Sequence, residues 1–242
     1  MGDGHIDNAV ILAAGRGKRL NKITKNIPKC LIEIKDKPII FHNLEILEKN
    51  GVKNVAIVVG YMARKVIEKI RSGNFKMNIM FVLNKEWEKT DNLYSLWCAK
   101  NIYTKFLLMM SDHLFSPKVI EKMLNLDFDD KILKIGVEKK WPGFEDCKVR
   151  IKRDLIVKIG KKLLSRYVDT GIFICKSDIY KYVEAALKKG RSKWSECIQI
   201  MAKDKKVGYY LINELRKKRK EILWCDIDTE KDLKRAQKFL LT

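Results

Sequence analysis

The amino-acid sequence predicts an α/β fold, namely a Rossmann-like, mostly parallel, doubly wound sheet that carries an antiparallel β insertion. Two observations lead to this fold class. Apolar runs of strand length alternate with amphipathic segments of helix length, which is the pattern of parallel strands joined by helices. Between about residues 131 and 175 the strand-like runs follow one another without helices, which indicates antiparallel strands. No repeat or linker divides the 242 residues, so a single domain over residues 1–242 is expected.

The first half of the chain is predicted to alternate between strand and helix. A continuous apolar run predicts a buried strand, and apolar residues at every third or fourth position predict a helix. Gly51 and Gly73 each follow a predicted helix, where glycine commonly ends one, and Asp91 or Asn92 is expected to cap the next helix. The expected strands are residues 9–14, 29–34, 52–60, 77–84 and 105–112, and the expected helices are residues 38–51, 61–73 and 91–102.

The second half begins with the antiparallel insertion and then returns to helices. Its first strand-like pieces follow one another without long helices between them, which indicates antiparallel strands. The expected strands are residues 131–140, 147–162, 167–175, 206–212 and 220–227, and the expected helices are residues 178–190, 194–203 and 230–241.

The charge balance favours an anionic partner. The chain has 51 Lys and Arg against 30 Asp and Glu, a formal net charge of +21. Phosphorylated metabolites, nucleic acids and acidic lipid headgroups all suit this excess of positive charge. An apolar content of 46% excludes an intrinsically disordered chain.

Cysteine usage and hydropathy indicate a cytoplasmic protein. The six cysteines form no C-x-x-C pair, which argues against a zinc site or a disulfide framework and favours a reducing compartment. No stretch reaches the roughly 18 apolar residues of a membrane span, and the N-terminus has no signal-peptide pattern. We therefore expect no membrane insertion.

A glycine-rich, basic loop follows the first predicted strand, in the stretch LAAGRGKR. It is not a dinucleotide-binding G-x-G-x-x-G motif, because Leu20 replaces the third glycine, and Leu12 and Arg19 break the P-loop pattern. Glycines still allow backbone N–H groups to cradle phosphate oxygens, and neighbouring cations neutralise the phosphate charge. The cations expected near this loop are Arg16, Lys18, Arg19 and Lys29.

Two acidic clusters follow other predicted strands. In open α/β sheets ligands bind at the carboxyl ends of the strands, where Asp112 and the pair Asp226 and Asp228 are expected. Carboxylates in these places could hold Mg²⁺ against phosphate oxygens. Each could instead cap the helix that follows it; since Asp228 is the better cap candidate, we prefer Asp226 as the second metal ligand and keep Asp228 as its competitor.

The stretch LAAGRGKRLNKITKNIPKCLIEI resembles the signature of the nucleotidyltransferases that join a nucleoside triphosphate to a sugar or alcohol phosphate. That signature is L-A-A-G-x-G-x-R followed about ten residues later by P-K. The stretches NLYSLWCAKN, MMSDHLFSP, YVDTGIFI and LWCDIDTEKDLKRA are similar to those of the inositol-1-phosphate cytidylyltransferases, and the likeness spans essentially the whole chain. It implies transfer of CMP from CTP to L-myo-inositol 1-phosphate, with Mg²⁺ as the cofactor and pyrophosphate as the second product.

The resemblance also implies a role for each candidate residue. The catalytic set is Arg19, Lys29, Asp112 and Asp226, and the metal is expected on Asp112 with Asp226 or Asp228. Arg19 and the loop amides would bind the triphosphate, and Lys29 the α-phosphate. The nucleotide-binding residues are Leu12, Ala13, Ala14, Gly15, Arg16, Gly17, Lys18, Arg19, Lys29, Asn84, Asn92, Ser95 and Asp112, and the acceptor-binding residues are Lys161, Asp169, Thr170 and Gly171.

The expected partners are therefore CTP and a small alcohol or sugar phosphate, with no nucleic acid. A homodimer is among the assemblies compatible with this reading. Some members of the family carry a membrane-bound domain after this one, and the absence of such a span here leads us to expect a stand-alone form.

Several alternatives remain open. The stretch DNLYSL is close to that of phosphocholine cytidylyltransferases, whose acceptor would need an aromatic face for its quaternary cation. The aromatic side chains that could supply it are Trp87, Trp141, Tyr167 and Trp224. Another sugar-phosphate nucleotidyltransferase is a further option. A basic nucleic-acid-binding protein is the alternative from a different class, although no recognised nucleic-acid motif accompanies the charge.

Overall fold

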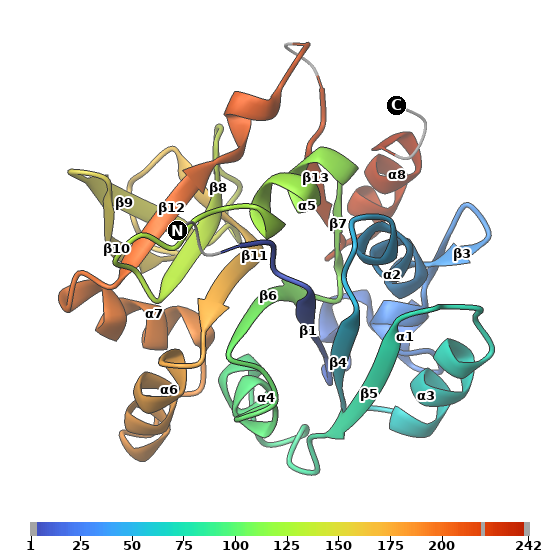
Figure 1. Cartoon of the computed structure of the whole chain (residues 1–242). Helices are drawn as coiled ribbons and strands as arrows, with labels where there is room; N and C mark the ends of the chain where they lie inside the picture. The colour runs from blue at the N-terminus through green and yellow to red at the C-terminus, as the bar shows by residue number, and fades with distance from the viewer. Residues whose placement is uncertain (1–3, 219–220, 240–242) are drawn as a thin grey trace.

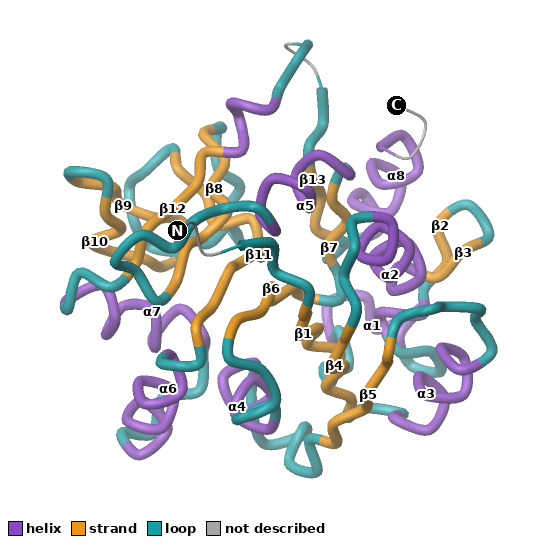
Figure 2. The backbone as a smooth tube through the Cα atoms, viewed as in Figure 1, coloured by secondary structure: helices purple, strands orange, loops and turns teal. Residues whose placement is uncertain are grey.

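The computed structural model describes residues 4–218 and 221–239 (Figures 1 and 2). Four parallel strands form one half of a nine-stranded sheet, in the order β5, β4, β1, β6. They are β1 (Asn8–Ala13), β4 (Asn54–Val59), β5 (Asn78–Leu83) and β6 (Lys105–Met110). Each joins the next through a helical connection, as the alternation of the sequence predicts.

The other half of the sheet is mixed. β11 runs antiparallel to β6, and β8 and β9 pair antiparallel with β11, whereas β12 is parallel to β8. The strands of this half are β8 (Leu133–Lys139), β9 (Lys148–Lys152), β10 (Leu155–Gly160), β11 (Tyr167–Lys176) and β12 (Val207–Leu211). The predicted fold class, including the antiparallel insertion, is confirmed.

Helices cover both faces of the sheet. Alternate residues of β1 point to opposite faces, so Ile11 packs in one core cluster and Val10 in the other. One face is covered by α2 (Ile39–Lys49), α3 (Ala63–Arg71) and α5 (Pro117–Leu124), and the other by α4 (Asn92–Cys98), α6 (Ile179–Lys188) and α7 (Trp194–Lys203). The burial of both sheet faces explains why the parallel strands are continuous apolar runs.

Small elements complete the fold beside the carboxyl ends of the parallel strands. β7 pairs antiparallel with β13, and β2 with β3. These elements are β2 (Glu33–Ile34), β3 (Lys37–Pro38), β7 (His113–Phe115), β13 (Trp224–Asp226), α1 (Asn21–Thr24) and α8 (Glu230–Phe239), with short 3₁₀ turns at Lys18–Leu20, Lys29–Leu31 and Ile212–Leu215. A third cluster of buried apolar side chains, which includes Leu20, Leu114 and Ile227, holds them together.

The structure corrects the prediction in four places. The strand expected at residues 147–162 is an antiparallel hairpin of β9 and β10, because Arg153 and Asp154 are left-handed, with φ 48° and 58°, and turn the chain back. Residues 29–34 are not one strand, because Pro28 is extended and starts a 3₁₀ turn before the two-residue β2. The strand expected at residues 220–227 is limited to the three residues of β13, which pair with the three-residue β7; Lys220 lies outside the described residues. The helix expected at residues 91–102 ends at Cys98, since Asn101 is left-handed with φ 65°.

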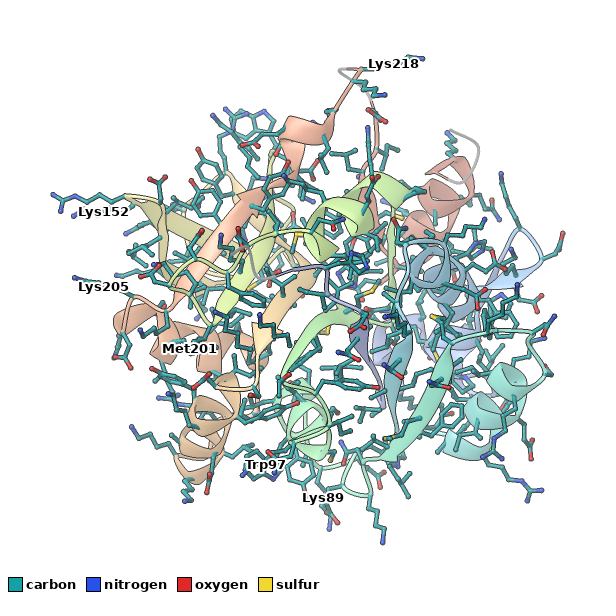
Figure 3. All side chains as sticks on the ribbon, viewed as in Figure 1. Lys89, Trp97, Lys152, Met201, Lys205 and Lys218 are labelled. Atoms are coloured by element: carbon teal, nitrogen blue, oxygen red, sulfur yellow. The ribbon has the colours of Figure 1, made fainter. Side chains whose placement is uncertain are left out.

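Surface charge is spread over the molecule. Figure 3 shows Lys218 at the top of the view, Lys89 at the bottom, and Lys152 and Lys205 both at the left, all with their side chains directed outward. No helix in the described ranges is both long enough and apolar enough to cross a bilayer.

Candidate active site

A cavity of about 400 Å³ opens at the carboxyl ends of β1 and β6. This volume is in the range of small-molecule binding sites. Its lining includes Leu12, Ala14, Gly15, Gly17 and Arg19 from the end of β1 and the glycine-rich loop, Asn92 and Ser95 from α4, and Lys29, Asp112 and Asp228. Ten of the predicted site residues thus lie around one cavity.

The glycine-rich loop is shaped for a ligand and for Lys29. A side chain at Gly15 would meet nothing within 4 Å, so the loop backbone faces open space there. Gly17 has φ 74°, and a Cβ on it would lie 2.9 Å from Cβ and Cδ of Lys29. Thr24 Oγ1 donates to the carbonyl oxygens of Gly17 and Leu20, at 3.0 and 3.1 Å, and fixes the loop. The second glycine is therefore required for the Lys29 side chain to pass.

Lys29 lies between two carboxylates. Its Nζ is 2.5 Å from Oδ2 of Asp112, directly after β6, and 2.7 Å from Oδ1 of Asp228, after β13. Arg19 contacts the second oxygen of Asp228 at 2.6 Å. Lys29 is only 7% exposed, and it lies between the glycine-rich loop and the two acidic clusters of the sequence.

Burial and opposite charge compete at this ion-pair cluster. Burial alone would lower the pKa of Lys29, but Asp112 and Asp228 outweigh it and the pKa is raised. Burial would likewise raise the pKa of Asp112, yet Lys29 and His113 hold that pKa well below its usual range. Lys29 and Asp112 are thus held in their charged forms. Burial would lower the pKa of His113, but the carboxylates of Asp112 and Asp226 outweigh it and the pKa is raised.

Asp226 has a different environment from Asp228. It lies opposite His113 in the β7–β13 ladder and does not line the cavity. Burial raises the pKa of Asp226; His113 opposes this effect, whereas the carboxylates of Asp228, Asp232 and Asp112 add to it. Asp226 is thus part of an acidic cluster that an additional cation would stabilise.

The carboxylates suit a divalent cation. Asp112 and Asp228 both lie within 2.7 Å of one ammonium nitrogen, and Asp226 is close enough to both to have its pKa raised by them. In the described ranges no three His, Cys, Asp or Glu side chains form a ready-made metal cage. Mg²⁺ in proteins commonly binds through one or two carboxylates and takes its remaining oxygens from water and phosphates.

The α4 side of the cavity is a polar wall. Asp91 caps α4 by accepting from the Asn92 N–H at 2.7 Å, and Asn92 Oδ1 accepts from the Trp194 N–H at 2.7 Å. Asn84 does not line the cavity; it is buried behind it and donates to Ser95 Oγ at 3.1 Å. The structure therefore places Ser95 and Asn92 within reach of a ligand and Asn84 in a supporting position.

The loop residues Ala13 and Arg16 are not part of the cavity lining. Ala13 points to the opposite face of the sheet from Leu12 and packs in the other core cluster. Arg16 lies over the Tyr61 ring, 5.6 Å from its centroid, outside the cavity lining. The side chain of Lys18 lies outside the described part of the structure.

None of the four predicted acceptor residues is in the cavity lining: Lys161 follows β10, and Asp169, Thr170 and Gly171 belong to β11. Lys161 Nζ pairs with Glu145 Oε2 at 2.7 Å, and the same oxygen is 3.6 Å from Arg19. Thr170 is buried and donates to the Gly136 carbonyl oxygen at 2.7 Å, so its hydroxyl group is committed to the sheet. Gly171, with φ 75°, forms an irregularity in the β8–β11 ladder.

Asp169 has an unusual carboxyl group. Burial raises the pKa of Asp169 to about 6, against a hydrogen bond from the Gly171 N–H and the charge of His113. The folded state therefore holds a proton on Asp169 between about pH 4 and pH 6 that the unfolded chain has released.

Asp169→Asn should consequently flatten the pH dependence of stability. A raised carboxyl pKa stabilises the folded state below the unfolded pKa near 4, and this contribution is lost as the pH rises through about 6. The free energy of unfolding of the variant, measured with urea, should match the wild type at pH 4 and exceed it by about 2 kcal/mol at pH 7. The exposed Asp178→Asn should show no such pH-dependent difference, and a pH-independent difference for Asp169→Asn would refute the assignment.

Six residues of the cavity lining are absent from the predicted site: Trp87, Thr90, Asp91, Met110, Ser111 and His113. His113 directly follows Asp112, and this adjacency was the available signal. Trp87 was considered only as an aromatic face for choline; it packs edge-on against Tyr61 with ring centroids 5.2 Å apart, and Gly60 leaves room for it.

Comparisons with known proteins agree with this geometry. Residues 8–138 match a family model described as nucleotidyl transferase. A protein of Aquifex aeolicus (strain VF5) named bifunctional IPC transferase and DIPP synthase is 31% identical over 98% of this chain and 52% of its own length. A choline-phosphate cytidylyltransferase of Streptococcus pneumoniae (strain ATCC BAA-255 / R6) is 32% identical over 44% of this chain and 45% of its own.

A solved structure, that of the inositol-1-phosphate CTP transferase from T. maritima, superposes with a TM-score of 0.85 at 26% identity and covers 98% of this chain and 96% of that one. The chain spans about half the length of the curated relatives it matches from end to end.

Proposed function

The chain belongs to the nucleotidyl transferase family, and on that premise we propose that it transfers CMP from CTP to L-myo-inositol 1-phosphate and releases pyrophosphate. One observation carries the proposal: the Lys29 ammonium group lies between Asp112 and Asp228 in a cavity bordered by the glycine-rich loop. Cations and a pair of carboxylates at strand ends are what a triphosphate and its metal require. The end-to-end likeness to an inositol-1-phosphate CTP transferase supports CTP and the inositol phosphate.

The proposed reaction is a direct displacement at phosphorus. An oxygen of the acceptor phosphate forms a bond to the α-phosphorus of CTP, and the bond from that phosphorus to the bridging oxygen of the β-phosphate breaks. The electron pair leaves with pyrophosphate. A phosphate monoester is mostly ionised at pH 7, because its second pKa is about 6, so the chain needs no general base. Its work is to bring two anions together in line.

Each charged side chain then has one task. The loop amides and Arg19 would bind the β- and γ-phosphates, and Lys29 would bind the α-phosphate, where negative charge accumulates during the displacement. Lys29 can do so throughout the neutral range because its pKa is raised. Ser95 and Asn92 on the α4 wall are our candidates for contacts with the base.

Asp112, with Asp228 and the neighbouring Asp226, would hold Mg²⁺. When bound, the ion would polarise the α-phosphate and neutralise the departing pyrophosphate. Asp228 is the nearer candidate because it shares Lys29 with Asp112, whereas Asp226 faces His113.

The direct test uses the purified protein with each nucleoside triphosphate, Mg²⁺ and a set of acceptor phosphates. Phosphate produced from pyrophosphate by a coupled pyrophosphatase gives the rate, and mass spectrometry identifies the product. CTP with inositol 1-phosphate should give CDP-inositol. Turnover only with phosphocholine would show that the acceptor is phosphocholine and not inositol 1-phosphate. Salt-sensitive RNA binding without any nucleotidyl transfer would overturn the proposal.

Lys161→Ala should weaken binding of the acceptor more than that of CTP. Lys161 pairs with the same Glu145 oxygen that Arg19 of the cavity lining approaches, and we assign it to the acceptor phosphate. Loss of one charge-assisted contact worth about 2 kcal/mol predicts a KM for the acceptor about 30-fold higher. Steady-state kinetics with each substrate varied in turn measure this. Lys162→Ala, the adjacent cation, is the control; equal increases of both KM values in Lys161→Ala would contradict the assignment.

A further inference from the structure

The backbone at His113 is fixed from two sides. The Asn43 amide of α2 donates to the His113 carbonyl oxygen at 2.9 Å, and the Ile227 N–H donates to the Asp112 carbonyl oxygen at 3.0 Å. Asn43 itself is buried. The turn that carries Asp112 and His113 is thus anchored both to a helix and to the segment that leads into Asp228.

The imidazole ring is confined as tightly as the backbone. It stacks on Trp224 with ring centroids 5.6 Å apart and an interplanar angle of 7°, and Trp224 Nε1 donates to the buried Glu138 at 2.9 Å. A Cβ on Gly171 would lie 2.8 Å from Nε2 of His113, so β11 approaches the ring as closely as a glycine allows. These contacts leave the ring one orientation.

In that orientation His113 Nδ1 is 2.8 Å from Oδ1 of Asp112. An ionised carboxylate only accepts, so Nδ1 is the donor. The two oxygens of Asp112 therefore have different partners: Oδ1 accepts from His113, and Oδ2 accepts from Lys29.

We propose that His113 is a positioning residue that holds Oδ1 of Asp112 and thereby presents Oδ2 to the metal–triphosphate complex. The proposal rests on the proposed function, because it takes Asp112 as a metal ligand. Hydrogen bonds to the outer side of a ligand fix its orientation and typically matter 10- to 100-fold, as an order-of-magnitude expectation, for metal affinity. The stacking of the ring on Trp224 and the close approach of Gly171 then hold the His113 Nδ1–H group in the direction of Asp112 Oδ1.

Two substitutions separate the hydrogen bond from the packing. His113→Phe keeps an aromatic ring for Trp224 and removes the donor, whereas His113→Asn keeps an N–H near the position of Nδ1 and removes the ring. Mn²⁺ is the probe, and electron paramagnetic resonance of the free ion gives its Kd with and without CTP. His42→Phe is the matched control, since His42 bonds to the Ile34 carbonyl oxygen and does not line the cavity.

We expect the Mn²⁺ Kd to rise about 10- to 100-fold in His113→Phe. In His113→Asn the Kd should return most of the way to the wild-type value, and in the control it should be unchanged. Unfolding temperatures show whether each variant is folded. A wild-type Kd in His113→Phe overturns the proposal, and so does equal weakening in both variants, which would leave only a packing role. Normal Mn²⁺ binding without CMP transfer to inositol 1-phosphate contradicts the proposed acceptor alone, whereas a wild type that binds no Mn²⁺ overturns both.

Discussion

Asp112→Asn is expected to lower kcat about 10³-fold while the protein remains folded. Asn keeps the size of the side chain and an oxygen for Lys29 or His113, but it removes the charge that would hold Mg²⁺. A loss of about 4 kcal/mol of transition-state stabilisation corresponds to that factor. Steady-state transfer of CMP from CTP, with Mg²⁺ varied from micromolar to tens of millimolar, gives both kcat and the metal dependence.

The matched control is Asp178→Asn, an exposed aspartate next to α6 whose ion pair with Lys181 is on the surface. It should retain wild-type kinetics, because surface substitutions rarely change more than local contacts. Wild-type activity in Asp112→Asn would refute the metal assignment. Activity that returned fully at high Mg²⁺ would assign Asp112 to metal affinity alone, without a further part in the transition state.

Asp226→Asn and Asp228→Asn, measured in parallel, decide which of the aspartates at the end of β13 and just after it is the second metal ligand. If Asp228 is the second ligand, its replacement should raise the Mg²⁺ concentration for half-maximal rate by at least tenfold, and Asp226→Asn should have the smaller effect. The reverse order would favour Asp226, which the sequence analysis preferred.

The fold class could be predicted from the sequence because the spacing of apolar residues shows which faces of a strand or helix are buried. Strands buried on both faces are continuous apolar runs, and β1, β4 and β6 all show this pattern. The short elements were harder to predict. The segment from Lys29 to Leu31 is buried like a strand, but it forms a 3₁₀ turn after the extended Pro28. Its own sequence does not distinguish the two structures.

The spacing between the glycines and Lys29 can now be understood physically. Gly17 and Lys29 touch, and a Cβ at position 17 would collide with the lysine stem. A motif comparison treats the two as separate matches, whereas the structure makes them parts of one contact. What local sequence could not resolve was the partner of Asp112: Asp226 and Asp228 are two residues apart, and the turn after β13 determines which of them reaches Lys29.

Lys29→Met separates the chemical role of the cluster from its structural one. Met has an unbranched stem that can pass Gly17, which the branched end of Arg would do less well. The loss of the ammonium group at the α-phosphate should lower kcat about 10²- to 10³-fold. It also leaves Asp112 and Asp228 facing each other without their shared cation.

Arg19 still pairs with Asp228, but the loss of Lys29 from between the two carboxylates should lower the free energy of unfolding by about 2 kcal/mol at pH 7.5. The effect is smaller than for a fully buried pair because both carboxylates are partly exposed. Adding Asp112→Asn to Lys29→Met removes one of the two like charges, so the double variant should regain part of the stability and none of the activity. Urea unfolding and CMP transfer measure the two effects, with the surface variant Lys37→Met as the control. If the double variant were no more stable than Lys29→Met, charge balance would not hold this cluster together. If Lys29→Met kept wild-type kcat, the lysine would be a purely structural counter-ion for the carboxylates.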